Sequence, residues 1–185
     1  GKLECNQIID GSLNIYKKES DLKNNNFTKI LKTSMVVNNM SYYDKKNVIG
    51  SNTTDRCLLS FFKPFNYEGI KKIKQIPFDS KNKYMITVID DKNVRNLIKG
   101  APEVLLKHCK YCYDENGRKK TFTSKVQIER KIKEATNNGI RVILLATSNH
   151  MTEKLFKDLV FVSIILIKDS VRKEAIEGIK LVKEA

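Results

Sequence analysis

Three short stretches of alternating apolar and polar residues follow one another between residues 72 and 98, and they constrain the fold more than any other feature. Lys72–Phe78, Lys83–Ile89 and Val94–Ile98 each have the twofold periodicity of a half-buried strand. The residues between them, 79–82 and 90–93, are rich in Asp, Asn and Lys, and this composition favours tight turns. Because turns this short join antiparallel neighbours, the segment predicts a β meander.

Helices are expected on both sides of this meander, where apolar side chains recur at helical spacing or where capping residues occur. These helices are placed at residues 27–39, from a cap at Thr53 or Thr54 through Phe62, after Pro102, after a Ser124–Gln127 capping box, and at 171–184. Gly139 is the expected end of the helix that follows Ser124.

Three further apolar stretches complete the predicted sheet: Leu3–Ile9, Ile140–Ala146 and Leu159–Ile167. Residues 41–54 lack periodicity and are expected to form a loop, and Asn116 with Gly117 predicts a hairpin-like turn. Helices and strands do not alternate strictly, as they would in a parallel sheet. The sequence therefore predicts an α+β fold, with an antiparallel β-sheet flanked by helices.

The net charge of +14 suits nucleic acid, anionic lipid or phosphate-bearing ligands. Lysines supply most of this charge and are spread along the chain, with no arginine-rich arm and no basic motif interleaved with aromatic residues. Solvated lysine-rich faces explain the pattern better than a nucleic-acid interface, so no nucleic-acid partner is expected. The longest apolar run, Leu159–Ile167, is far shorter than the roughly 20 residues that cross a bilayer. The chain is expected to be a soluble fragment of a longer protein, excised before Gly1.

The sequence lacks the motifs of self-contained catalysis. It has no GxxxxGK[ST] or GxGxxG phosphate loop, no GxSxG nucleophile motif and no HExxH metal motif. Cys109 and Cys112 form a single CxxC without a second pair of ligands, so we expect reduced cysteines near a helix end rather than a zinc site. No catalytic residue and no metal ligand is therefore assigned.

Lys99 ends an apolar strand and is followed by Gly100. A glycine there is expected to leave a gap that a flat or anionic group can enter. A partly buried lysine needs a counter-charge, which a nucleotide phosphate would supply. The alternatives are that Lys99 pairs with a carboxylate of the protein or extends its amino group to solvent.

Phe78 follows the first strand of the meander, immediately before a polar turn. An aromatic face at a strand end can stack on a base, although ordinary core packing is the simpler reading of the spacing. Lys83 begins the next strand and is expected to lie near Phe78 across the hairpin. Together the two residues form a candidate nucleotide-binding site.

Several motifs occur in an order that resembles the cytoplasmic nucleotide-binding domain of P-type ATPases, specifically the type II cation pumps. These are VIGSNTTDRCLLSFF at 48–62, PFDSKNKYM at 77–85, IKGAPEVLLKHC at 98–109, NGIRVILLA at 138–146, and the segment 158–185. The resemblance covers nearly the whole chain, and its KGAPE and PF-x-S-x-x-K-x-M patterns are specific. These motifs are most similar to those of calcium or sodium–potassium pumps, with calcium favoured.

The resemblance implies a role for each candidate residue. Phe78 would stack on adenine, and Lys83 would line the pocket. Lys99 would lie deep in the nucleotide cleft, with Gly100 leaving room for the adenine. Arg141 would reach the phosphates.

Asp55 would contact the adenine end, although the family has a glutamate there and the shorter side chain weakens the expected contact. A second departure lies in the return hinge, where the family's D-P-x-R is Asp-Ser-Val-Arg at 169–172. The loss of proline makes the hinge less stiff.

The resemblance also implies a context. Residues 1–157 would be the nucleotide-binding domain, and 158–185 the return hinge with the start of the phosphorylation domain. The phosphorylated aspartate and the magnesium-binding motifs are not in this chain, so the domain would bind ATP and leave magnesium mainly to the phosphorylation domain. The expected partners are the phosphorylation and actuator domains of one membrane pump, on its cytoplasmic side. The fragment itself would be monomeric and inactive, and a basic nucleic-acid or protein-interaction module is the alternative.

Overall fold

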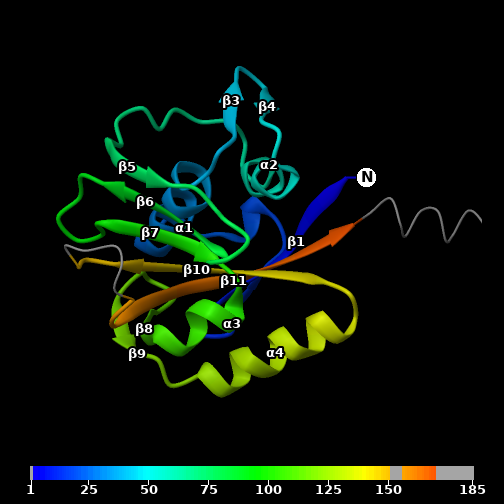
Figure 1. Cartoon of the computed structure of the whole chain (residues 1–185), viewed down its shortest axis with the longest axis vertical. Coiled ribbons are helices and arrows are strands. Elements are labelled where there is room, and N and C mark those ends of the chain that lie inside the picture. Colours follow the sequence, from blue (N-terminus) through cyan, green and yellow to red (C-terminus); the bar gives the residue numbers. More distant parts are fainter. Residues whose placement is uncertain (1, 151–155, 170–185) are drawn as a thin grey trace, which may run out of the picture.

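The computed structural model describes residues 2–150 and 156–169. They form a mainly antiparallel sheet with helices on both faces, which confirms the predicted α+β class (Figure 1). The main path of the sheet runs β2 (Ile15–Tyr16), β1 (Leu3–Asp10), β11 (Leu159–Asp169), β10 (Arg141–Ser148), β7 (Asn96–Gly100), β6 (Tyr84–Ile89) and β5 (Lys72–Ile76). β8 (Cys109–Tyr113) pairs in parallel with the start of β11, and β9 (Lys119–Thr121) pairs with β8.

The predicted meander is confirmed, because β5, β6 and β7 pair in sequence as antiparallel neighbours. The first and last described strands are also neighbours, with Leu3 opposite Asp169. Figure 1 shows β1 beginning beside the end of β11. The described chain therefore enters and leaves the sheet at one place. The predicted helix at 171–184 and the hinge at 170–172 lie outside the described residues.

Helices cover the sheet on both sides and divide the core into two main clusters. α1 (Asn26–Val37) and α2 (Thr53–Ser60) bury side chains such as Leu31, Met35 and Leu58 against one face. α3 (Pro102–Leu105), the short turn η2 (Leu106–His108) and α4 (Lys125–Asn137) pack on the other, with Leu105 and Ile128 in the core. The two pairs of helices lie on opposite sides of β10 and β11 in Figure 1. A short η1 (Glu19–Asp21) precedes α1.

Two predicted helix caps are wrong, although the helices exist. The N-cap of α2 is Asn52, whose Oδ1 accepts a hydrogen bond from the Asp55 N–H at 2.9 Å. Both threonines that follow it lie inside the helix. Ser124 precedes α4 but forms no capping box, because its hydroxyl donates to the Gly11 carbonyl instead. Gly139, with φ of 72°, ends α4 as predicted.

The segment expected to be a loop contains a small hairpin of β3 (Tyr42–Asp44) and β4 (Asn47–Ile49). Each strand has only three residues and pairs only with the other, so no clear periodicity marks them. The predicted turn at Asn116 and Gly117 is confirmed, because it joins β8 to β9. Gly117 has φ of 84°, which a glycine adopts without strain.

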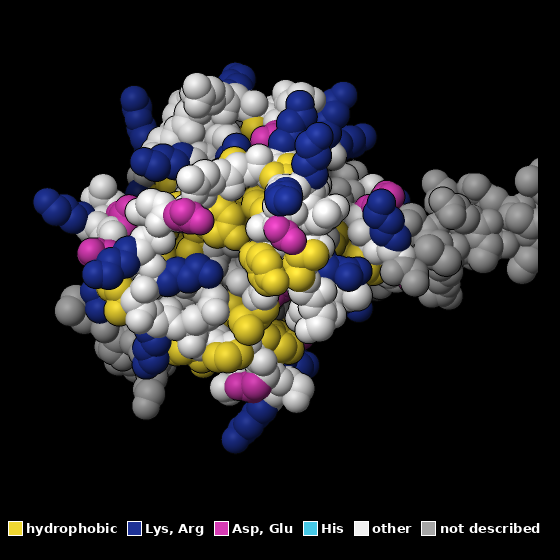
Figure 2. Space-filling model, turned by 90° about the horizontal axis from the view of Figure 1, so that it is seen from above, with side chains coloured by type: hydrophobic (Ala, Val, Ile, Leu, Met, Phe, Trp, Pro, Cys, Tyr) yellow, Lys and Arg dark blue, Asp and Glu magenta, His cyan; other side chains and the backbone are white. Residues whose placement is uncertain are grey.

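One face of the molecule carries both basic and apolar side chains. Figure 2 shows Lys and Arg side chains distributed around one face, while hydrophobic side chains gather nearer its centre. The large hydrophobic side chains that remain exposed include Met40, Tyr42, Ile73 and Phe78. None of the helices in the described part of the chain is long and apolar enough to cross a membrane.

Candidate functional site

The sheet register brings the predicted site residues to one end of the sheet. Gly100, the last residue of β7, lies opposite Tyr84 at the start of β6 and opposite Leu144 of β10. Arg141 begins β10, three residues before Leu144, and so lies at the same end. Phe78 follows the end of β5, also at this end. The antiparallel order therefore places segments that are distant in sequence along this end of the sheet, here called the sheet edge.

Lys99 forms an ion pair with Asp55 beneath this edge. The two residues are only 5% and 3% exposed, so the pair lies almost entirely inside the protein. Burial lowers the pKa of Lys99, and the neighbouring Asp55 carboxylate opposes that shift. Pairing with a carboxylate of the protein, one of the alternatives that the sequence leaves open for Lys99, is therefore present in the structure.

Asp55 is held from several directions. Its Oδ2 accepts a hydrogen bond from the Met40 N–H at 2.8 Å, while its Oδ1 faces Lys99. Its carbonyl accepts from Asn39 Nδ2 at 2.8 Å, and Asn39 Oδ1 accepts from the Ser41 N–H at 2.7 Å. These bonds tie the turn that follows α1 to the first turn of α2. Sequence reasoning missed Asn39, since an asparagine after a helix ordinarily indicates only a cap or turn.

Arg141 lies against the beginning of α2. Its Nη1 donates to Thr54 Oγ1 at 2.8 Å, across 87 positions of sequence. Thr54 directly precedes Asp55, so the arginine and the buried pair meet at the same helix turn. Arg141 is exposed, and its guanidinium can contact an anion that approaches the edge.

Phe78 and Lys83 belong to the loop that joins β5 to β6. Phe78 is 52% exposed, so the alternative that it is an ordinary core residue is wrong. The Lys83 N–H donates to the Asp79 carbonyl at 2.8 Å, and Lys83 has φ of 61°, which closes the turn. Its Nζ lies 3.7 Å from Glu103 Oε1, and both side chains are more than half exposed. That ion pair is too exposed to hold the lysine firmly.

Glu103 is a further residue that sequence reasoning missed. It is the last letter of the KGAPE motif, and it lies in the first turn of α3. The motif itself was the available signal, because it places Glu103 four residues after Lys99 at the same edge.

Gly100 has a structural explanation that differs from the expected one. A Cβ at this position would lie 2.4 Å from the Lys83 carbonyl oxygen and 2.8 Å from Tyr84 Cα. The space beside the glycine is therefore filled by the backbone at the start of β6, and the prediction of an open gap there is wrong. The glycine is needed because the two strands approach so closely.

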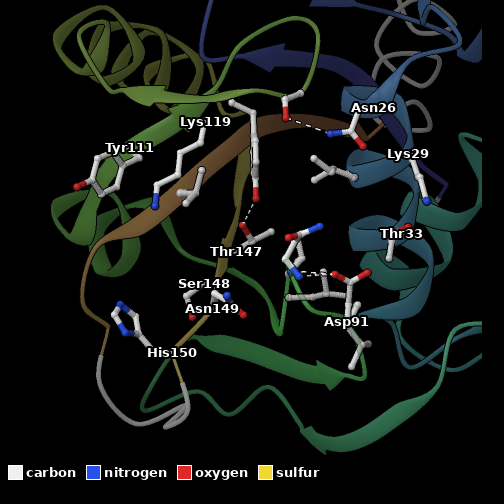
Figure 3. A pocket seen from close by; sticks show the side chains of 18 of the residues that line it. Asn26, Lys29, Thr33, Asp91, Tyr111, Lys119, Thr147, Ser148, Asn149 and His150 are labelled. Carbon is white, nitrogen blue, oxygen red and sulfur yellow. Dashed lines mark hydrogen bonds between the residues drawn. The ribbon is translucent and has the colours of Figure 1, made fainter.

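A cavity of about 620 Å³ opens at the opposite end of the sheet (Figure 3). Tyr111 and Lys119 lie on one side of it, and Asn26 and Thr33 of α1 lie on the other. At its floor, the hydroxyls of Tyr113 and Thr147 are 2.7 Å apart. None of the predicted site residues lines this cavity. Of the two carboxylates that line it, Asp91 and Asp158, Asp91 already accepts hydrogen bonds from the backbone of its own turn.

The cysteines offer little reactivity. Cys109 and Cys112 lie on β8, directly after η2, and both are fully buried. Burial raises the pKa of Cys109 to about 12 and raises that of Cys112. Within residues 2–150 and 156–169, no cluster of three or more His, Cys, Asp or Glu side chains could hold a metal ion.

The described residues define an α+β domain in which a half-exposed aromatic ring lies at the same end of the sheet as exposed cationic side chains. Residues 26–174 match the family model described as P-type ATPase, cytoplasmic domain N. The chain belongs to this family, which confirms the resemblance seen in its motifs.

Three relatives illustrate the similarity. The chain is 32% identical over 175 residues to calcium-transporting ATPase PAT1 of Dictyostelium discoideum, covering 84% of this chain and 16% of the relative. It is 28% identical over 199 residues to calcium-transporting ATPase 1 of Saccharomyces cerevisiae, covering 92% and 21%. Calcium-transporting ATPase 1 of Bacillus cereus is also 28% identical, over 187 residues, with 93% and 21% covered. The chain thus spans about a fifth or less of the length of these relatives.

Proposed function

We propose that this chain binds ATP at the sheet edge and presents it for phosphorylation of an aspartate elsewhere in a calcium-transporting P-type ATPase. The observation that carries this proposal is that Phe78, Lys83 and Arg141 lie at the same end of the sheet as the buried Asp55–Lys99 pair. Membership in the domain N family supports the nucleotide, and the names of the relatives support calcium as the transported ion.

The chemistry of each exposed residue suggests a different role in binding ATP. Phe78 offers a ring face on which adenine can stack. Lys83 and Arg141 are exposed cations that can neutralise the phosphates, because a guanidinium and an ammonium both donate to phosphate oxygens. Lys99 and Gly100 form the floor beneath them. The domain contributes position and charge, which is the main requirement of phosphoryl transfer.

The remaining parts of the proposal concern the whole pump. Residues 1–157 constitute the nucleotide domain, and 158–185 lead back toward the phosphorylation domain. Magnesium is bound mainly by that domain, and the actuator domain is the other partner within the pump. By itself the chain is a monomer that binds nucleotide weakly and hydrolyses none, on the cytoplasmic side of an integral membrane protein.

The test is a two-dimensional amide NMR titration of the chain with a non-hydrolysable ATP analogue. Saturable shifts are expected around Phe78, Lys83 and Arg141. Phe78→Ala should weaken binding at least about fivefold, because base–aromatic stacking contributes about 1–3 kcal/mol. Ile73→Ala is the matched control, since Ile73 is also 52% exposed but lies on the outer strand β5.

Either of two outcomes would refute the proposal. The first is the absence of shifts at millimolar nucleotide. The second is shifts confined to the cavity at the other end of the sheet. Tight, salt-sensitive binding of polynucleotide without a saturable mononucleotide site would instead establish a basic interaction module.

A further inference from the structure

We infer that Thr121, on the short outer strand β9, is a phosphorylation site for a basophilic serine/threonine kinase, and that Lys110 and Lys119 pair with its phosphate. Thr121 lies beside the cavity, at the other end of the sheet from the proposed nucleotide site. The inference therefore does not depend on the proposed function.

The first argument is the charge pattern before Thr121. Arg118, Lys119 and Lys120 precede it, and it is the one serine or threonine of the chain with three consecutive basic residues directly before it. Basophilic kinases select substrates by such residues, because carboxylates in the kinase groove pair with them. The segment thus has the charge pattern that this class of kinase recognises.

The second argument is the accessibility of the segment. Arg118 and all three residues of β9 are exposed, and within the described residues β9 pairs with β8 alone. Kinases bind their substrate segments in an extended form, and a short outer strand is already extended and opens locally at little cost. Phe122 stacks on Phe161 with ring centroids 4.7 Å apart, so it anchors the chain directly after Thr121 and limits the opening to β9.

Other hydroxyl residues with a lysine three positions before them are less suitable. Ser20 lies in η1 and Thr136 in α4, so both segments are helical. The Thr136 hydroxyl also donates to a carbonyl of its own helix at 3.1 Å. Thr123 is exposed, but Lys120 is the only basic residue among the three that precede it. Sequence and structure together therefore favour Thr121.

The third argument is the pair of ammonium groups near Thr121. Thr121 lies opposite Tyr111 in the β8–β9 ladder, so the two side chains share a face of the sheet. The Nζ of Lys119 lies 4.2 Å from the centroid of the Tyr111 ring, and the Nζ of Lys110 lies 5.7 Å from it. Asp158 holds Lys110 only weakly, at 4.0 Å and with the lysine side chain 62% exposed. A phosphate on Thr121, with a charge of about −1.5 to −2, can accept charge-assisted hydrogen bonds from both lysines.

The chemistry is phosphoryl transfer from an ATP molecule held by the kinase. The Thr121 hydroxyl oxygen bonds to the γ-phosphorus, and the bond from that phosphorus to the β-phosphate oxygen breaks. ADP leaves, and the hydroxyl proton passes to the catalytic aspartate of the kinase. The cavity wall that carries Tyr111 and Lys119 (Figure 3) thereby gains negative charge.

The experiment incubates the chain with a purified basophilic serine/threonine kinase and ATP, and locates the phosphate by tandem mass spectrometry. A synthetic peptide of residues 115–125 is the control for recognition by the kinase. We expect phosphate on Thr121 in both, and none at this position in Thr121→Val. Arg118→Gln should lower the rate at least about tenfold, because it removes a charge-assisted contact with the kinase. Thr123→Val is the matched control and should react like the unmodified chain.

Three outcomes would overturn the inference. Phosphate on the peptide but not on Thr121 of the folded chain would mean that β9 does not open. Phosphate on neither would mean that the basic residues are not recognised. Phosphate on Thr123 in place of Thr121 would mean that the wrong hydroxyl has been assigned.

Phosphorus NMR tests the partners of the phosphate. The second pKa of a phosphothreonine is about 6, and two nearby ammonium groups should lower it in the folded chain relative to the phosphorylated peptide. Lys119→Met should move the titration midpoint back toward the value of the peptide. Equal midpoints in the chain and the peptide would overturn the assignment of Lys110 and Lys119 as partners of the phosphate.

Discussion

Replacing Gly100 by alanine tests how closely β6 and β7 approach at the candidate site. The new Cβ would lie 2.4 Å from the Lys83 carbonyl oxygen, whereas ordinary contacts begin at 3.4 Å, so the backbone must move by about 1 Å. The same carbonyl accepts a hydrogen bond from the Ala101 N–H at 2.9 Å, and that movement weakens it. Overpacking costs about 1–3 kcal/mol and a lost hydrogen bond about 0.5–1.5 kcal/mol, so we expect a loss of about 2–4 kcal/mol.

The assay is urea unfolding followed by far-ultraviolet circular dichroism, because the chain has no tryptophan. Thermal unfolding gives a second measure of the same loss. For a domain of this size each kcal/mol lowers Tm by about 2–4 °C, so Gly100→Ala should melt about 5–15 °C below the unmodified chain. Gly69→Ala is the matched control, since a Cβ there meets nothing within 4 Å. The reasoning is refuted if Gly100→Ala unfolds within about 0.5 kcal/mol of the unmodified chain.

Three further predictions concern stability. Asp55→Ala should destabilise the chain by about 3–5 kcal/mol in urea, because it leaves Lys99 buried without its partner, and adding Lys99→Met should restore much of that loss. An Asp55→Ala variant as stable as the unmodified chain, or a double variant no more stable than Asp55→Ala, would contradict this prediction. Burial raises the pKa of Cys57 and of Cys109 from 9.0 to about 12, so the folded chain retains protons that the unfolded chain releases. Stability is then fully present below pH 9 and falls between pH 9 and 12, by about 1.4 kcal/mol per pH unit for each thiol, and equal urea midpoints at pH 7.5 and 10.5 would contradict this. Gly139→Ala should lose about 1 kcal/mol from its φ of 72° alone, as nothing lies within 4 Å of its Cβ, and an unchanged midpoint would contradict it.

Local periodicity in the sequence was sufficient to predict the main helices and strands. The meander over β5, β6 and β7 was predictable because each strand alternates and each turn has its own polar residues. α1 and α4 were predictable for the same reason at helical spacing. The hairpin of β3 and β4 was not, because three-residue strands carry too few side chains to establish a period.

Helix N-caps were harder to predict, because several neighbouring residues are of a type that can cap a helix. Asn52 and the two threonines after it are all good caps by type. The helix begins at Thr53, so Asn52 lies just outside it as the N-cap. Ser124 found a partner in Gly11, which is 113 positions away, so no local rule could have anticipated it.

The sequence by itself determined the fold class, the family, and the identity of the candidate residues, because these depend on short patterns that neighbours in the chain share. Only the tertiary structure decided how those residues interact. Lys99 and Asp55 are 44 positions apart, and Arg141 and Thr54 are 87 apart. Whether a lysine faces a ligand or a carboxylate, and whether a glycine borders open space or another strand, depends on which segments the sheet order brings together. Burial then makes those pairings costly to break.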